Sequence, residues 1–322
     1  MSKVALMILF NHNYEQNLDR LDQIYKGRFE SIWYIMPFYR GARKDVITVY
    51  ENSFYFHASV VKALERVQNE RFDHYMIIAD DLLLNPAINQ DNYADFLLLD
   101  RSAAFIPGLF LLNDIHETRP YRPMAPYWFW IDAATDFTPE QRGIDVTGLL
   151  PTYEQAVKKL ARHDLRFTPE MGWRMYLWKG FFSKQFFKVF WDRKLFKKFR
   201  AALYFFGTSM LYSKKVMKYP LVGSYSDIVV VPHQSAYEFT RYCGVFGSLR
   251  LFVEMALPTA LALSAEKIVD ESCLTSKGHV VWTPEDILGF ETHYDNSLTS
   301  LLKNFPSDAL YIHPVKLSRW NT

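Results

Sequence analysis

Four short, mainly apolar runs near the start of the chain constrain its fold more than any other feature. Unlike amphipathic strands, these runs alternate little between apolar and polar residues, which is typical of strands that are covered on both faces, as in parallel sheets. Such strands require crossover connections and helices on both sides of the sheet. The runs occupy residues 4–10, 31–39, 45–51 and 74–79.

Two segments with helical periodicity separate these runs. Residues 13–27 end at Gly27, a helix stop signal, and residues 53–67 begin at Ser53, a candidate N-cap. The order strand-helix-strand-strand-helix-strand predicts an open α/β sheet with right-handed crossovers.

The rest of the chain continues the mixed pattern less regularly, without internal repeats. Its length of 322 residues favours one α/β domain, 1–322, in which 1–110 form a nucleotide-binding half and 111–322 an acceptor-binding half. The further elements that the pattern predicts are a strand pair in 102–113, helices in 152–163, 236–263 and 294–305, and a strand in 225–232.

Composition and charge exclude several classes of protein. A net charge of +2 gives no overall nucleic-acid signature. Two cysteines, Cys243 and Cys273, make neither a disulfide framework nor a metal cluster and favour a reducing, cytoplasmic compartment. No apolar run reaches the length of a transmembrane helix, because the longest candidate, 251–263, contains Glu254 and Pro258. The N-terminus lacks a signal-peptide cleavage site and is expected to be a first strand.

Polar residues follow three of the predicted strands. Asn11 and His12 follow the first, Arg40 follows the second, and Asp80 with Asp81 follows the fourth. Ligands of open α/β sheets bind beyond the carboxyl ends of the strands. The sequence therefore predicts a binding site at this edge.

Asp80 and Asp81 follow a buried run directly, and their mutual repulsion needs an explanation. Burying an unpaired charge is costly, so the pair requires water or a cation. Three roles are open to the two acids. They could be solvated loop residues before the turn at Asn85-Pro86, ligands of Mg²⁺ or Mn²⁺, or general acid/base groups. No tuned partner for acid/base chemistry lies nearby in the sequence, so the context favours a metal.

This arrangement resembles the GT-A glycosyltransferases, whose DxD motif holds a divalent cation on the donor's diphosphate and contacts its ribose. The matching residues are Ala79, Asp80 and Asp81, with Ala79 in place of the first acid. The helix 53–67 and a histidine after the last helix, His313, also match the family's layout. The resemblance implies a GT-A-like (Rossmann-like) open mixed sheet flanked by helices, with Mn²⁺ or Mg²⁺ as a Lewis acid for the departing nucleotide diphosphate.

The resemblance also assigns roles to single residues. Asp81, Asp80 and His313 become metal ligands, although a lone histidine is equally well explained as a hydrogen-bonded surface residue. The donor-binding residues that it implies are Asn11 and His12 for base and ribose, Asp80 for ribose, and Arg40 with Arg43 for phosphate, where solvated loop arginines are the alternative.

An inverting transferase needs a general base, and two acids are candidates for this catalytic role. Asp227 lies at the start of the predicted strand in 225–232, where a turn or cap acid is the alternative. Glu254 lies in an apolar helix, where pairing with Arg250 on the same helical face is the alternative. A retaining enzyme needs no such base, and the sequence leaves both outcomes open.

Residues 173–206, within a helical insertion at about 165–215, interleave Lys and Arg with Trp and Phe. This pattern fits an interfacial membrane segment, a groove for single-stranded nucleic acid, or an amphipathic core helix pair with a basic face. No recognisable nucleic-acid-binding fold accompanies it. A peripheral membrane contact is therefore favoured, and no nucleic-acid partner is expected.

These features together predict a cytoplasmic glycosyltransferase, peripherally associated with the inner face of the membrane. It would move a sugar from a nucleotide-diphosphate donor, with a UDP-sugar favoured, to a hydroxyl of a glycan or lipid-linked glycan in surface polysaccharide assembly. One alternative is a nucleotidyltransferase acting on sugar phosphates, although residues 11–17 are not the Gly-rich loop that it would carry. The other is a non-catalytic glycan- or membrane-binding scaffold, which Ala79 favours.

Overall fold

The chain forms two compact units in a computed structural model. The first unit combines Met1–Leu109 with Ser224–Thr322, and the second is Phe110–Gly223. Residues 224–322, expected in the acceptor-binding half, thus belong to the same unit as residues 1–109. The basic aromatic stretch 173–206 lies outside the described residues. The structure describes residues 3–69, 71–112, 133–134, 136–140, 144, 146, 148–169 and 216–321.

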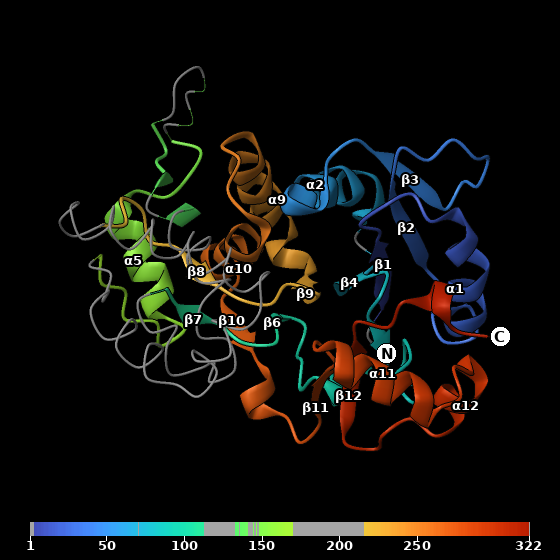
Figure 1. The fold of residues 1–322 in the computed structure, drawn as a ribbon. Helices are drawn as coiled ribbons and strands as arrows, with labels where there is room; N and C mark the ends of the chain where they lie inside the picture. The colour runs from blue at the N-terminus through green and yellow to red at the C-terminus, as the bar shows by residue number, and fades with distance from the viewer. Residues whose placement is uncertain are drawn as a thin grey trace, which may run out of the picture. The chain divides into compact units, whose positions relative to one another are not determined.

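A seven-stranded mixed sheet forms the centre of the first unit (Figure 1). Its strand order is β10-β6-β9-β4-β1-β2-β3. β9 runs antiparallel to both of its neighbours, whereas the other pairs are parallel. The prediction of an α/β fold with an open mixed sheet flanked by helices is confirmed. The strands are β1 (Val4–Leu9), β2 (Ile32–Pro37), β3 (Val46–Val49), β4 (His74–Ala79), β6 (Ala103–Phe105), β9 (Ile228–Pro232) and β10 (Lys267–Val269).

Helices cover both faces of this sheet, which explains why its first strands are apolar on both sides. Leu6 and Ile8 of β1 share a core cluster with Leu21 and Ile24 of α1 (Leu18–Tyr25). Alternate residues of a strand point to the opposite face, where α2 (Phe56–Val67) packs on β1, β2 and β3. α2 in turn contacts α9 (His233–Ser248), and α9 contacts α10 (Val253–Ser264).

The single long helix expected in 236–263 is wrong, because the chain turns between α9 and α10. Arg250 has a left-handed backbone with φ of 57°. The amide of Arg250 donates to the carbonyl of Gly247, and the amide of Leu251 donates to the carbonyl of Phe246. These are the two hydrogen bonds of a Schellman motif, which ends a helix. The usual signal, glycine at the left-handed position, is absent from the sequence.

The start of the second helix also differs from the expectation. A 3₁₀ turn, Ser53–Tyr55, precedes α2, and the side chain of Asn52 caps it by accepting from the amide of Phe54. Ser53 is therefore not the N-cap. Similarly, α1 begins after the 3₁₀ turn Glu15–Asn17, later than the start expected at residue 13.

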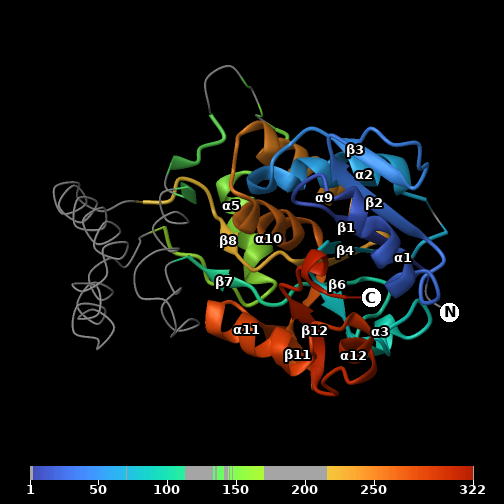
Figure 2. The ribbon, with the colours of Figure 1, turned by 45° about the vertical axis from the view of Figure 1, so that its right-hand side comes forward.

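A small second sheet in the first unit has the order β11-β12-β5. β5 (Leu83–Leu84) begins two residues after Asp81, and β12 (Ala309–His313) runs antiparallel to it. β11 (Lys277–Val280) pairs parallel with β12. The helices α11 (Pro284–His293) and α12 (Leu298–Lys303) lie beside this sheet (Figure 2). The sequence pattern predicted neither β11 nor β12, and α12 is shorter than the expected helix 294–305.

The second unit is described only in part. β7 (Phe110–Leu111) pairs antiparallel with β8 (Val222–Gly223). The predicted helix 152–163 corresponds to α5 (Tyr153–Ala161), where Thr152 and Gln155 form a capping box.

Another short helix, α3 (Tyr93–Phe96), belongs to the first unit. Of all the helices in the described ranges, none combines the length and the apolar character needed to cross a membrane.

Candidate functional site

The carboxyl ends of β1 and β4 hold the first part of the candidate site. The amide of Asp80 donates to the carbonyl of Leu9 at 2.8 Å, and the amide of Asn11 donates to Asp80 Oδ1 at 3.4 Å. β1 connects onward to β2 on one side, whereas β4 lies on its other side. Such a point, where the strand order reverses, opens a crevice in which α/β proteins bind ligands.

The antiparallel direction of β9 brings Asp227 to the same edge. β9 starts beside the end of β4, because Ile228 is paired with Ile78. The amide of Ala79 donates to the carbonyl of Asp227 at 2.9 Å. A parallel strand in this position would have placed its first residues at the opposite edge.

The small sheet supplies His313. Pairing of Ile312 with Leu83 places the end of β12 next to the acidic pair, and the amide of Val315 donates to the carbonyl of Asp81 at 2.6 Å. The imidazole then lies between two carboxylates. Its Nε2 is 3.3 Å from Asp81 Oδ1, and its Nδ1 is 3.4 Å from Asp227 Oδ2. We call Asp80, Asp81, Asp227 and His313 the carboxylate–histidine cluster.

Asp80 is the most strongly perturbed acid of this cluster. It is 6% exposed. Burial, followed by the negative charge of Asp81, raises its pKa to about 7, and hydrogen bonds from the amides of Asn11 and Asp80 offset only part of this effect. Asp80 is therefore a carboxylate whose ionised form lacks adequate compensation at neutral pH.

His313 provides positive charge to the cluster. Burial by itself lowers the pKa of this imidazole, but the carboxylates of Asp227, Asp81 and Asp80 together raise it above its usual value. The imidazole therefore holds its proton more tightly than an exposed histidine does. Asp81 Oδ1 is buried and makes no hydrogen bond, although it lies 3.3 Å from His313 Nε2.

The arrangement has the donor set of a hard divalent cation. Carboxylate oxygens suit Mg²⁺ and Mn²⁺, and Mn²⁺ also accepts imidazole nitrogen. The buried oxygen of Asp81 without a hydrogen bond and the poorly compensated Asp80 fit such a cation. In the part of the chain that the structure describes, no group of three or more His, Cys, Asp or Glu is already arranged to hold a metal ion.

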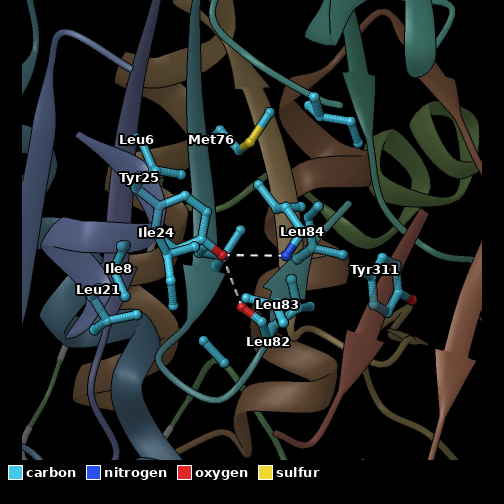
Figure 3. Close-up of a cluster of buried hydrophobic side chains, with 14 of the residues drawn as sticks. Leu6, Ile8, Leu21, Ile24, Tyr25, Met76, Leu82, Leu83, Leu84 and Tyr311 are labelled. Atoms are coloured by element: carbon cyan, nitrogen blue, oxygen red, sulfur yellow. Dashed lines mark hydrogen bonds between the residues drawn. The ribbon is translucent and has the colours of Figure 1, made fainter. Parts of the chain in front are cut away.

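Tyr25 supports the segment after the acidic pair, a role that nothing in the sequence indicates beyond the position of Tyr25 on the apolar face of α1. Its buried hydroxyl donates to the carbonyl of Leu82 and accepts from the amide of Leu84, both at 3.2 Å (Figure 3). The helix thereby fixes the chain between Asp81 and β5. Figure 3 shows the same ring among core side chains that include Leu6 and Ile24.

Tyr311, two residues before His313, was also missed. Its hydroxyl donates to Glu271 Oε1 at 2.6 Å. Burial, then the charges of Glu271 and Asp227, raises its pKa. The ring lies where a Cβ on Gly278 would be, only 2.2 Å from the ring carbon Cζ. A glycine on β11 therefore allows the ring to lie flat against that strand.

The predicted donor-binding side chains lie elsewhere on the edge. Arg40 and His12 are exposed, and the ring of His12 packs against that of Tyr14 at 5.6 Å. The expectation that Arg43 is free for phosphate is wrong, because its guanidinium binds Asp22 at 2.9 Å and Asp45 at 2.6 Å.

Glu254 lies in the first turn of α10, and its backbone carbonyl accepts from the amide of Ser224 at 3.0 Å. The alternative role of Glu254, a pairing with Arg250 on one helical face, does not hold in that form, because Arg250 lies in the turn before this helix. The guanidinium of Arg250 instead lies 3.6 Å from Glu51 and over the ring of Tyr55.

Among the described residues, the carboxylate–histidine cluster is thus the strongest candidate for a functional site. Three distant parts of the chain meet in it, at the edge where such sheets bind ligands. Searches of protein-family models, of curated proteins and of solved structures found no match to this chain.

Proposed function

We propose that this chain is a glycosyltransferase of the GT-A type, which moves a sugar from a nucleotide-diphosphate donor to a hydroxyl of a glycan or lipid-linked glycan. One observation carries the proposal: Asp80 and Asp81 meet Asp227 and His313 where the strand order reverses between β1 and β4. The order β3-β2-β1-β4 is also that of the nucleotide-binding half of doubly wound sheets.

Asp80, Asp81 and His313 are the residues that would hold Mn²⁺ or Mg²⁺. When bound, the cation supplies Lewis-acid stabilisation of the charge on the departing nucleotide diphosphate. The position of Asp227 supports this assignment, because metal-binding histidines usually donate their second ring N–H to a carboxylate. Nδ1 of His313 faces Asp227, which leaves Nε2 on the side of Asp81.

Side chains of this protein would deprotonate the acceptor hydroxyl and bind the donor nucleotide. The side chain of Asp227 is 29% exposed, so one of its oxygens can accept the proton of the acceptor hydroxyl while Oδ2 faces His313. Glu254 is the second candidate for this base. Asn11 fixes Asp80 through its backbone amide, and exposed His12 and Arg40 would contact the nucleotide.

The proposed setting is the cytoplasmic face of a membrane. It rests on the sequence of residues 173–206, whose cations and aromatic rings suit an anionic bilayer surface. A lipid-linked glycan acceptor would be presented at that surface.

The test combines ligand binding with transfer. The thermal shift of the full chain would be measured with nucleotides, nucleotide sugars and nucleoside triphosphates, each with and without Mn²⁺. We expect a UDP-sugar to stabilise the chain only with Mn²⁺, and Asp81→Ala to abolish both this shift and transfer. Asp91→Ala, which removes an exposed loop acid, serves as the matched control and should behave as wild type.

Several outcomes would refute the proposal. Sugar transfer that persists in Asp81→Ala would show that the carboxylate–histidine cluster is not needed for the reaction. Stabilisation by nucleoside triphosphates and sugar phosphates alone would indicate a nucleotidyltransferase instead. No response to any nucleotide would indicate a non-catalytic scaffold.

A further inference from the structure

Exposed aromatic side chains gather at one edge of the first unit. In the described ranges five aromatic side chains are exposed, and four of them follow β1, β2 or β3 at the carboxyl ends of these strands. Single exposed apolar residues are common on protein surfaces, but a group of aromatic rings marks an interaction site. The four are Tyr14 at 41%, Phe38 at 57%, Tyr50 at 70% and Phe54 at 50% exposure.

We call these four residues the aromatic edge. Phe38 and Tyr50 form its centre. Their rings contact edge to face at 5.7 Å. The backbone amide of Phe38 donates to the carbonyl of Val49 at 3.0 Å, and the side chain of Asn13 donates to the carbonyl of Phe38 at 3.1 Å. The loops after β1, β2 and β3 are therefore tied together beneath the two rings.

Phe38 is held in an unfavourable backbone conformation. Its φ is 55°, in the left-handed region that bulky residues rarely adopt. Such strain persists where the surrounding structure enforces it, and it clusters at functional sites. A glycine would satisfy this turn without strain, so this chain places an exposed aromatic ring where the backbone favours a residue without a side chain.

Cationic groups accompany the rings. Lys62 Nζ lies 5.4 Å from the centroid of the Tyr50 ring, and Arg40 is exposed two residues after Phe38. The nearby acid Glu51 is within 3.6 Å of the guanidinium of Arg250. Two cations, Lys62 in space and Arg40 in sequence, therefore accompany the central pair of rings.

We propose that the aromatic edge docks on an anionic phospholipid bilayer. Aromatic rings prefer the headgroup level of a membrane, and each adjacent cation is attracted to anionic lipids. A fluid surface needs no fixed complementary shape, which suits two exposed rings with cations beside them. This surface is separate from residues 173–206, and the proposal does not rest on glycosyl transfer.

Vesicle co-sedimentation of the full chain tests the proposal directly. The vesicles are pure phosphatidylcholine, or phosphatidylcholine with phosphatidylglycerol at a molar ratio of about 70 to 30, in the range where anionic lipid attracts basic segments. We expect Phe38→Gly with Tyr50→Ser to lower partitioning into the anionic vesicles roughly tenfold. Lys62→Gln should lower it about fivefold, and added salt should reduce this difference.

The controls separate loss of binding from loss of folding. Phe38→Gly removes the ring and relieves the left-handed backbone, so the melting temperature should not fall. Tyr237→Ser with Leu288→Ser removes side chains that are 70% and 65% exposed on α9 and α11, and this variant should bind as wild type does.

Three results would overturn the proposal. The first is equal partitioning of wild type and the Phe38/Tyr50 variant, which would leave residues outside the aromatic edge responsible for binding. The second is equal binding to neutral and anionic vesicles. The third is unchanged vesicle binding together with loss of the nucleotide-dependent thermal shift, which would assign the rings to a nucleobase. Vesicle binding requires no catalysis, so failure here leaves the proposed transfer reaction separately testable.

Discussion

Asp80→Asn should stabilise the protein above neutral pH in the absence of divalent cations. Burial and the charge of Asp81 raise the pKa of Asp80 to about 7, from 3.8 in the unfolded chain. The folded state therefore binds this proton more tightly, and the free energy of unfolding falls as pH rises from about 4 to about 7. Above about pH 7, Asp80 is ionised in both states, and the free energy of unfolding falls no further because of this group. The amide variant keeps the size of the side chain and carries no charge.

The size of the effect follows from the same pKa difference. Roughly 3 pH units at about 1.4 kcal/mol per unit give an upper limit of about 4 kcal/mol at pH 8. Below pH 4 the difference should vanish, apart from any change in hydrogen bonding. His313, whose pKa is also raised, loses stabilisation in the same direction as pH rises, so the variant must be compared with wild type at each pH.

Urea denaturation between pH 4 and pH 9 with EDTA measures this difference. The wild type should lose stability relative to the variant up to about pH 7, and the difference should then be constant. Asp91→Asn, a change at an exposed loop acid, should follow wild type throughout. Mn²⁺ should stabilise wild type more than the Asp80 variant. A variant that is no more stable than wild type at pH 8 would show that the ionised Asp80 is well compensated, and the argument would fail.

Two other predictions concern residues that the sequence pattern did not single out. Tyr25→Phe removes the hydroxyl between Leu82 and Leu84 and should lower the free energy of unfolding by about 1–3 kcal/mol, with faster amide exchange at Leu84; unchanged exchange there would contradict the supporting role. His57 is fully buried in α2, its ring nitrogens make no hydrogen bond, and burial lowers its pKa to about 3. The unfolded chain binds a proton at His57 below about pH 6.5, whereas the folded protein does so only near pH 3, so the free energy of unfolding falls as pH falls through this range. His57→Leu lacks this loss and should gain about 2 kcal/mol over wild type between pH 7 and pH 5. Parallel acid-denaturation curves of the two proteins would refute this.

The elements that the sequence predicted are those with local signals. The apolar runs of β1 and β4 and the polar residues that follow them are readable without knowing any partner. The rule that ligands bind beyond the carboxyl ends of strands then brings Asn11 and Asp80 together. Asp227 was found because it lies next to a recognisable strand, although its antiparallel direction was not foreseen.

The features that the sequence did not predict depend on non-local pairing or on unusual residues. The resemblance placed Asp81 and His313 together, but the pairing of β5 with β12 that brings them close was not predicted, because β5 has only two residues. The turn at Arg250 uses arginine where glycine is usual. The hydrogen bonds of Tyr25 were not predicted, because its position in the helical pattern indicates only that the ring faces the core.

The pairing of β5 with β12 also has a consequence for biosynthesis. The side chain of Asn85 donates to the carbonyl of Ala309, across 224 residues of sequence. At about 5–20 residues per second, the ribosome needs on the order of 10–50 s to deliver β12 after Asp80 and Asp81 have been made. The parallel strands β1 to β4 can pair during this interval, but the contact of Asp81 with His313 can form only after β12 has been synthesised. The carboxylate–histidine cluster is therefore complete only in chains whose translation has passed His313.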